Sequence, residues 1–348
     1  MKKFLRYEFK KHLWPILIVT LCCALPCLLF AALNPMVEEG VRHWNGELYR
    51  RVYSPGTWLP LIELLALAYG VPVAVYSFKM KKRSVDCYYA LPIKKEKLYF
   101  IKTLVGLSLM LVPFTAAFWG MVFVTAIRPE NPYVMGWFVP QYFALLGFGI
   151  CLYGFNAFVF TRANAWGDGI VFVFAYTFVA VLAIGTGLMA IDATSDVLDM
   201  HFMEYLMPPV GSIVFNINME ALCMGEKVIE EWNVCMFLLP TLYGLIGYFF
   251  LFFNLRFDKG ENAEQVSDSW FGYRVLIPIY TACCLGLCGG IDEFLLFAFF
   301  FVVITVSAFV VTMIYRRKFL FPVKNLIIIG VGLGVGLVLA IVIAIVHN

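Results

Sequence analysis

Two aspartates stand where acid–base chemistry could arise, because Asp168 and Asp192 flank a single apolar stretch. A helix over this stretch would rise about 1.5 Å per residue, so the two carboxyl groups would lie roughly 36 Å apart and could not share a water molecule. The histidines also lie outside the apolar stretches, at His12, His43, His201 and His347. No G-x-S-x-G nucleophile motif occurs. We therefore expect neither an enzyme active site nor a metal site.

Glu63 differs from the other carboxylates because it lies several residues inside an apolar run, 57–78. A charged side chain near the centre of a bilayer costs about 2.5–3.5 kcal/mol on insertion scales, and less toward the interface. Two interpretations stay open. Glu63 could bind a cationic substrate group or a proton in a translocation path, or it could be a protonated or hydrogen-bonded packing residue near the outer rim.

The chain carries no ATP-binding motif of its own. A phosphate-cradling loop needs G-x-x-x-x-G-K-[ST], and no Gly-Lys dipeptide occurs in the sequence. If ATP and its magnesium ion drive this protein, another polypeptide must bind them. We expect no cofactor bound directly to this chain.

Four alternating glycines near the C-terminus, Gly330, Gly332, Gly334 and Gly336, do not form a dinucleotide fingerprint. Val335 stands where the last glycine of G-x-G-x-x-G would fall, and the run lies inside an apolar stretch. Small residues four apart allow two membrane helices to approach closely. We therefore interpret Gly330/Gly334 and Gly332/Gly336 as helix-packing positions.

The composition predicts that these residues are positioned by membrane helices. The 348 residues are 62% apolar and 14% charged, against about 45–50% and about 25% in soluble domains, and the mean hydropathy is +0.85. The net charge of +3 is too small to indicate a nucleic-acid partner. The ten cysteines include no CxxC pair and mostly lie in apolar runs, so we expect no redox or metal chemistry from them. Cys223 alone would face the oxidising side.

Nine apolar runs are long enough to cross a bilayer, which takes about 20 residues and as few as about 17. The sequence thus predicts an all-α, polytopic transmembrane bundle. The first run is too long for the apolar region of a signal peptide and has no A-x-A cleavage site, so we keep it as a span. The predicted spans are 13–33, 57–78, 104–126, 138–160, 170–191, 233–254, 275–291, 293–314 and 326–346.

The distribution of cations fixes the expected orientation. With the N-terminus in the cytoplasm, 21 of the 26 Lys and Arg residues fall inside, as the positive-inside rule requires. The run 275–291 is short and ends at Gly289-Gly290, but if it did not cross, Arg316 to Lys324 would be exported. We therefore keep nine spans, with the C-terminus outside. The five external cations are Arg42, Arg50, Arg51, Arg128 and Lys227.

Residues 2–13 place Leu5, Phe9 and Leu13 on one stripe of a helix, with lysines and arginine around the rest. This pattern predicts an interfacial helix on the cytoplasmic leaflet. A basic tail that only fixes the topology is the alternative.

The densest cytoplasmic feature is the loop 79–102. Ser84 could cap a short helix that places Val85, Tyr88 and Tyr89 on one face, and Pro92 would end it or begin the next helix. A short amphipathic helix joined rigidly to two spans is suited to docking on a soluble partner. Outside the membrane, the loops 34–56 and 192–232 are long, and the second could contain helical pieces that dip into the membrane edge near Tyr205–Met207 and Ile213–Phe215.

The segment Tyr89-Ala90-Leu91-Pro92-Ile93, followed by Lys94-Lys95-Glu96-Lys97-Leu98 and then Lys102, resembles the first intracellular loop of type-2 ATP-binding-cassette (ABC) exporter permeases. Those proteins carry an "sLPisRkkl...K" pattern there; Lys94 and Lys95 stand where the family often has Arg. The basic N-terminal helix, six core spans and long loop after span 5 are similar to that family. Arg256 to Trp270 and Tyr315-Arg316-Arg317-Lys318-Phe319 resemble the larger bacterial forms with extra C-terminal spans.

The resemblance implies roles for these segments. Residues 1–12 would be the elbow helix, and 13–254 the six-span core with the coupling loop 79–102 and the extracytoplasmic loop 192–232. Residues 255–348 would add a cytoplasmic linker and three further spans. The implied contacts with the ATPase are Tyr88, Tyr89, Leu91 and Pro92.

Together these features lead us to expect the membrane subunit of an exporter in a bacterial cell membrane. A separate ATPase subunit and a second permease copy would be its partners, and an amphipathic cargo such as an antimicrobial peptide or lipid would be its substrate. An ion-coupled secondary transporter that uses Glu63 is the alternative, and a non-transporting scaffold or sensor is a third reading.

Overall fold

The computed structural model describes residues 2–41, 48–190, 208–226, 235–257, 260–265, 267, 271–291, 293–316 and 322–347. The chain divides into two compact units, each made of three segments. Unit 1 comprises Met1–Val75, Pro92–Asn156 and Pro208–Arg256, and unit 2 comprises Tyr76–Leu91, Ala157–Met207 and Phe257–Asn348. The coupling loop expected at 79–102 is therefore shared: its first half belongs with the C-terminal helices and its second half with the N-terminal ones.

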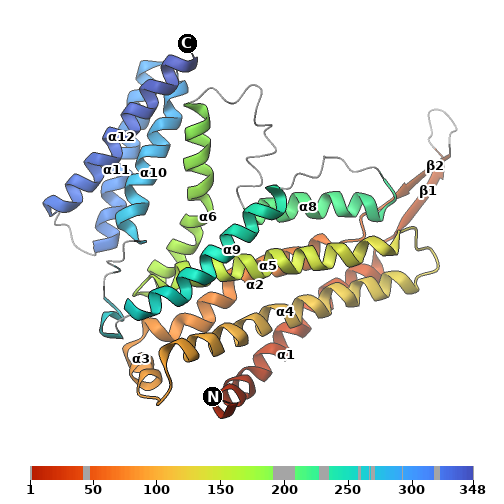
Figure 1. Ribbon diagram of the computed structural model, residues 1–348. Helices are drawn as coiled ribbons and strands as arrows, with labels where there is room; N and C mark the ends of the chain where they lie inside the picture. The colour runs from red at the N-terminus through yellow and green to blue at the C-terminus, as the bar shows by residue number, and fades with distance from the viewer. Residues whose placement is uncertain are drawn as a thin grey trace. The chain divides into compact units, whose positions relative to one another are not determined.

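Unit 1 is a set of long apolar helices with one small hairpin (Figure 1). The hairpin lies in the expected loop 34–56 and pairs antiparallel from Val37↔Val52 to Val41↔Leu48. Sequence reasoning did not predict it, because the adjacent charges Glu38-Glu39 and Arg50-Arg51 break the apolar–polar alternation typical of a strand. The elements are α1 Lys2–Leu33, β1 Val37–Val41, β2 Leu48–Val52, α2 Trp58–Tyr76, α4 Lys95–Ile127, η2 Met135–Trp137, α5 Phe138–Thr161, which runs on into unit 2, α8 Pro208–Cys223 and α9 Cys235–Phe253.

Unit 2 combines a short helical platform with four long helices. In α10, α11 and α12 nearly every position is apolar, so these helices can only be buried in protein or lipid. The elements are η1 Ser77–Met80, α3 Lys82–Tyr89, α6 Trp166–Met189, η3 Asn254–Phe257 at the junction with unit 1, η4 Gly260–Asn262, α10 Tyr273–Leu287, η5 Cys288–Gly290, α11 Phe294–Arg316 and α12 Val323–His347.

Eight helices of the described residues are long and apolar enough to cross a membrane. They coincide with eight of the nine predicted runs, including the short one, which appears as α10 and η5 over Tyr273–Gly290. The remaining run, 233–254, is α9, whose apolar stretch Pro240–Phe253 is shorter. The all-α, polytopic architecture predicted from the sequence is thus confirmed, and the chain is a multi-pass membrane protein.

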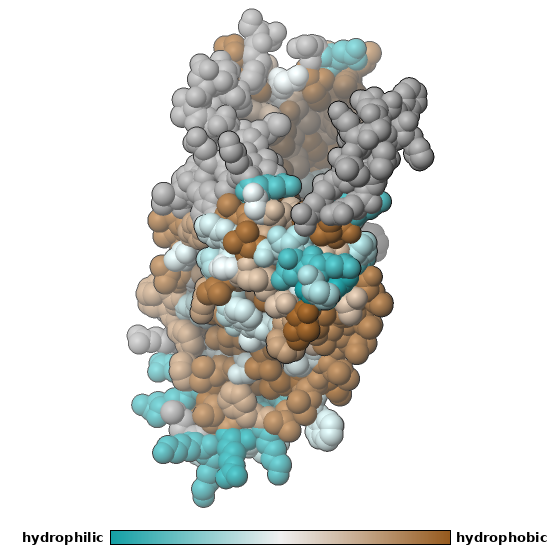
Figure 2. Space-filling model, turned by 90° about the vertical axis from the view of Figure 1, so that its right-hand side faces the viewer, coloured by the Kyte–Doolittle hydropathy of each residue, from teal (hydrophilic) through white to brown (hydrophobic). Residues whose placement is uncertain are grey.

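Large apolar side chains lie on the outside of these helices. Trp14 is 71% exposed and Leu295 is 83% exposed, and apolar residues cover much of the face drawn in Figure 2, where hydrophilic ones gather in separate patches. Soluble monomers rarely expose such continuous apolar surface. In a membrane, lipid acyl chains would contact these residues.

The basic N-terminal segment continues into the first span without a break. Residues 2–12 and 13–33 form the single helix α1, and the position of residues 2–12 on a leaflet stays a prediction. Glu8 explains the local arrangement, because its carboxylate is fully buried and lies 2.8 Å from Lys102 Nζ on α4. His12 Nδ1 lies 3.7 Å from the same carboxylate. This buried ion pair ties the basic end of α1 to the first turns of α4.

Two of the four C-terminal glycines pack α12 against α10. A Cβ on Gly332 would stand 2.8 Å from Pro278 Cα, and one on Gly336 would stand 3.0 Å from Ala282 Cα. A Cβ on Gly330 or Gly334 would meet nothing within 4 Å. Gly330 and Gly334 face away from α10 and pack against no other helix among the described residues, so the prediction that these two pack a helix stays a prediction.

Replacing Gly332 by Ala should separate these two classes of glycine. The new Cβ would collide with the α10 backbone, which cannot rotate away, and such overpacking costs about 1–3 kcal/mol. Gly334→Ala makes the same chemical change over open space, and should be neutral or stabilise the helix by up to about 1 kcal/mol. The measurement is thermal unfolding of both variants in one detergent. Equal melting temperatures would contradict this packing.

Candidate functional site

The short helix α3 is mounted on unit 2 by its apolar face. Val85 is 2% exposed, and the Tyr88 ring lies 4.9 Å from the Phe78 ring of η1 at 55°. The predicted face of Val85, Tyr88 and Tyr89 therefore exists, but it is turned toward the chain itself, since Tyr89 is also only half-exposed. Ser84 is not the cap: Lys81 occupies that position and makes no side-chain capping bond.

The opposite face of α3 is polar and open. Lys82, Arg83, Asp86 and Cys87 are exposed, as is Pro92 in the turn that follows, whereas Leu91 is half-buried. We call Lys82, Arg83, Asp86 and Cys87 the outward face of α3. A partner would thus meet charged side chains, and the aromatic residues would hold α3 in place behind them.

A chain of hydrogen bonds supports α3 from below. The Lys82 backbone N–H donates to Glu264 Oε1 at 3.3 Å, and the Glu264 N–H donates to the Asn164 carbonyl at 3.0 Å. The Asn164 N–H donates to Ser267 Oγ at 2.9 Å. Glu264 adopts a φ of 65°, uncommon for a residue other than glycine, so the segment is bent sharply to make these contacts.

Asp168 ends this chain of bonds at the start of α6. The Ser267 hydroxyl donates to Asp168 Oδ2 at 2.7 Å and the Tyr273 hydroxyl donates to Oδ1 at 3.1 Å. Asp168 thus joins the linker to α6 and α10. Its role in the fold is structural, in contrast to the acid–base role considered above. Asp192, its proposed partner, lies outside the described residues. Lys79 adds a further tie by donating to the Thr161 carbonyl.

Glu63, the translocation candidate, faces a cysteine in unit 1. Cys27 Sγ of α1 lies 3.6 Å from both carboxylate oxygens. Glu63 is half-buried, and within the part of the chain that the structure describes no Lys or Arg lies within salt-bridge distance of it. A carboxyl group held only by a thiol can exchange a proton or a cation more readily than one held by a fixed cation.

A second carboxylate, Glu220 of α8, lies at the centre of a hydrogen-bonded cluster formed by α8, α5 and the segment 54–58. Its Oε1 accepts from the Trp58 N–H at 3.1 Å and from the Thr57 hydroxyl, and its Oε2 accepts from the Ser54 hydroxyl at 2.8 Å. Gln141 Nε2 of α5 donates to Thr57 Oγ1 and to Asn216 Oδ1 at 2.9 and 3.0 Å. We call these six residues the Glu220 cluster.

The Glu220 cluster is buried and anchors α8, a helix too short to cross the membrane. Thr57 and Gln141 are fully buried, and Glu220 is 9% exposed. α8 contains the predicted piece Ile213–Phe215, whereas Tyr205–Met207 lies outside the described residues. Sequence reasoning missed the cluster, although the polar spacing of Asn216 and Glu220, one turn apart in an apolar segment, was the available signal.

In the described ranges, no group of three or more His, Cys, Asp or Glu side chains could hold a metal ion. No protein-family model, curated protein or solved structure matches this chain. Its own residues are therefore the basis for a functional assignment.

Cys223, at the end of α8, should report on the integrity of the Glu220 cluster. Burial, with a smaller contribution from the Glu220 carboxylate, raises the pKa of this thiol from 9.0 to about 12. Because the thiolate is the reactive form, an alkylating reagent at pH 8 should modify exposed Cys87 and leave Cys223 intact, as peptide mass spectrometry would measure. Raising the pH to 10 should change little at Cys223.

Glu220→Gln should increase the alkylation of Cys223 for two reasons. Loss of the negative charge lowers the pKa of the thiol, and the new amide N–H₂ faces the hydrogen-bond donors of Ser54, Thr57 and Trp58, which loosens the cluster. Leaving a buried donor unpaired costs about 1–3 kcal/mol. Glu226→Gln, an exposed carboxylate on the same segment, is the matched control and should have no effect. Rapid alkylation of Cys223 in the unmodified protein would overturn this view of the cluster.

Proposed function

We propose that the chain is the membrane-spanning subunit of an ABC exporter, driven by a separate ATPase that docks on the outward face of α3. The observation that carries this proposal is the construction of α3: a charged face, exposed and backed by aromatic packing, on a helix bonded to the linker ahead of α10. A segment that only set the topology would need scattered lysines and no such support.

The hydrogen-bond chain gives a mechanical path for coupling within unit 2. A push on α3 would be passed from Lys82 through Glu264 and Asn164 to Ser267, and from there to Asp168 and Tyr273 at the ends of α6 and α10. These bonds, from 2.7 to 3.3 Å long, are directional, so α3 would move with these helices. Closure of the ATPase around ATP and magnesium would then displace membrane helices, which is the step that an exporter requires.

The remaining features of the proposal follow the sequence. The N-terminus lies in the cytoplasm, α9 crosses as a ninth span, and two copies of the subunit meet in a bacterial cell membrane. The cargo is amphipathic, a peptide or a lipid, because the spans carry few fixed charges and many aromatic side chains. No nucleic acid takes part.

Reversing a charge on the outward face of α3 should uncouple the ATPase. Arg83→Glu should abolish co-purification with the ATPase encoded beside this chain and the stimulation of its ATP hydrolysis, since a surface contact would become repulsive. Arg51→Glu makes the same change on the exposed hairpin strand β2 and should leave both unchanged. Tyr88→Ala, by contrast, should loosen α3 from Phe78 and lower the melting temperature as well.

Association and stimulated hydrolysis that survive Arg83→Glu would end the docking role of α3. The ATPase must first be shown to associate with the unmodified chain. No association with any ATPase would count against the whole proposal.

The isolation of Glu63 from fixed cations favours one alternative, an ion-coupled secondary transporter. In that case the chain alone, in vesicles with a proton gradient, should transport substrate or carry protons, and Glu63→Gln should abolish the flux. Glu130→Gln, an exposed carboxylate beyond α4, is the control. Gradient-driven transport without an ATPase would favour this alternative; its absence, with transport restored by an ATPase and ATP, would favour the exporter.

A further inference from the structure

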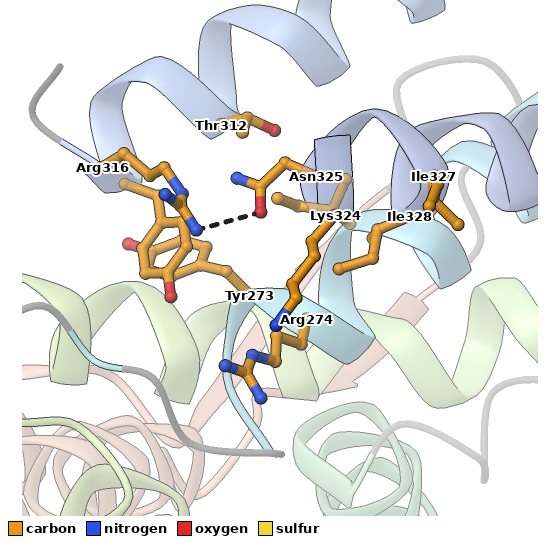
Figure 3. Close-up of a pocket in the computed structure, with 10 residues that line it drawn as sticks. Tyr273, Arg274, Thr312, Arg316, Lys324, Asn325, Ile327 and Ile328 are labelled. Carbon is orange, nitrogen blue, oxygen red and sulfur yellow. Dashed lines mark hydrogen bonds between the residues drawn. The ribbon is translucent and has the colours of Figure 1, made fainter. Parts of the chain in front are cut away.

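A pocket of about 290 Å³ lies among the ends of α10, α11 and α12 in unit 2 (Figure 3). It is formed by the first turns of α10 and α12 and by the last turns of α11. These helix ends belong to the side of the membrane at which the Lys and Arg residues of this part of the chain gather. Tyr273 lines this pocket and also ends the proposed coupling path, but the cations of the pocket take no part in that path.

The pocket brings together three cations from three helices. Arg274 comes from α10, Arg316 from α11 and Lys324 from α12, and none of the ten lining residues is acidic. Figure 3 shows the side chains of Arg274 and Lys324 converging at one side of the pocket, while Arg316 reaches across to Asn325. Its Nη2 donates to Asn325 Oδ1 at 3.2 Å, which fixes the guanidinium in place.

The Arg316 guanidinium retains hydrogen-bonding capacity. Its Nε is buried and has no hydrogen-bond partner among the described residues. An unsatisfied donor in a cationic pocket is best served by an anion with several acceptor oxygens. A phosphate group meets this requirement, because guanidinium groups bind it through paired N–H donors.

The starts of two helices add to the attraction that this pocket offers an anion. Arg274 and Lys324 lie in the first turns of α10 and α12, where the helix dipole is positive and disfavours cations. These two helix ends present backbone N–H groups, which favour phosphate. An anion in the pocket would offset both the repulsion among the cations and their placement at helix starts.

The walls of the pocket distinguish a lipid from a soluble phosphate. Ile277, Ile327 and Ile328 line it beside the cations, and the rings of Tyr273 and Tyr315 pack at 37° with centroids 4.3 Å apart. Ile327 is 57% exposed and Val331, one turn further along α12, is 56% exposed. An apolar strip thus leads from the cationic pocket along α12 toward the depth of the membrane, as an acyl chain attached to the phosphate would need.

We propose that this pocket binds the phosphate headgroup of an anionic phospholipid, with Arg274, Arg316 and Lys324 as its ligands and the exposed face of α12 along its acyl chains. Basic pockets between membrane helices are suited to such headgroups. The site is independent of the export function and would hold in a transporter of any class.

Native mass spectrometry of the protein from nanodiscs that mix phosphatidylglycerol and phosphatidylcholine tests this site. The unmodified chain should retain phosphatidylglycerol in preference to phosphatidylcholine. Arg274→Gln/Lys324→Gln should lower that retention at least about tenfold, since charge-assisted bonds to phosphate are about twice as strong as neutral ones. Both residues are exposed, so the fold should be kept, which thermal unfolding would verify.

Two further variants keep the test sharp. Lys94→Gln/Lys97→Gln removes the same charge from exposed positions before α4 and should leave retention unchanged. Arg274→Lys/Lys324→Arg keeps the charges and should restore it. Equal retention in the glutamine variant of the pocket and in its control would overturn the proposal.

Inorganic phosphate and glycerol phosphate distinguish the source of the anion. Neither should displace the retained phosphatidylglycerol at millimolar concentration, because neither can occupy the apolar strip along α12. Displacement by either would show that the pocket is a site for soluble phosphate. Equal retention of phosphatidylcholine and phosphatidylglycerol would show that the pocket does not select an anion.

Discussion

The hydrocarbon core of a membrane offers no hydrogen-bond partner, and this constraint decides where the polar side chains of this protein lie. Several buried polar groups are paired from within the chain: the Glu8 carboxylate with Lys102, Asn156 Nδ2 with the Ala68 carbonyl at 3.0 Å, and the Glu220 carboxylate with its cluster. A buried charge without its partner costs about 3–5 kcal/mol. These pairs therefore join particular helices, α1 to α4 and α8 to α2 and α5, where apolar packing alone would allow sliding.

The same constraint suggests a binding role for surfaces on which cations outnumber carboxylates. The outward face of α3 carries Lys82 and Arg83 beside the single carboxylate of Asp86, and the pocket at Arg274, Arg316 and Lys324 has no acidic residue in its lining. α3 is nevertheless held firmly by Phe78 and Glu264, so its charges are displayed by a rigid element. Rigid support behind open charge is typical of binding surfaces, since it limits the entropy lost on association.

The sequence predicted what depends on hydrophobicity and missed what depends on distant pairing. Apolar runs located eight spanning helices because bilayer thickness fixes their length. The face of Val85 and Tyr88 was recognised from helical spacing, but its direction was not, because Phe78 lies on another element. The roles of Glu8 and Asp168 required knowing that Lys102 and Ser267 lie beside them, which spacing along the chain does not reveal. The choice between Gly332 and Gly334 likewise depends on which side of α12 meets α10.

Both cationic surfaces of unit 2 are linked to α10: the pocket directly through Arg274, and α3 through the hydrogen bonds that run from Glu264 to Asp168. Tyr273 donates a hydrogen bond to Asp168 at the end of the chain from α3, and its ring packs against that of Tyr315 in the wall of the pocket. A displacement of α10 would therefore change the distance between Arg274 and the cations of α11 and α12. A phosphate held by all three would resist that displacement, because its attraction falls with distance from each cation. A bound anionic lipid and a partner pressing on α3 would therefore both act on α10. The lipid would oppose the movement of this helix, and the partner would drive it.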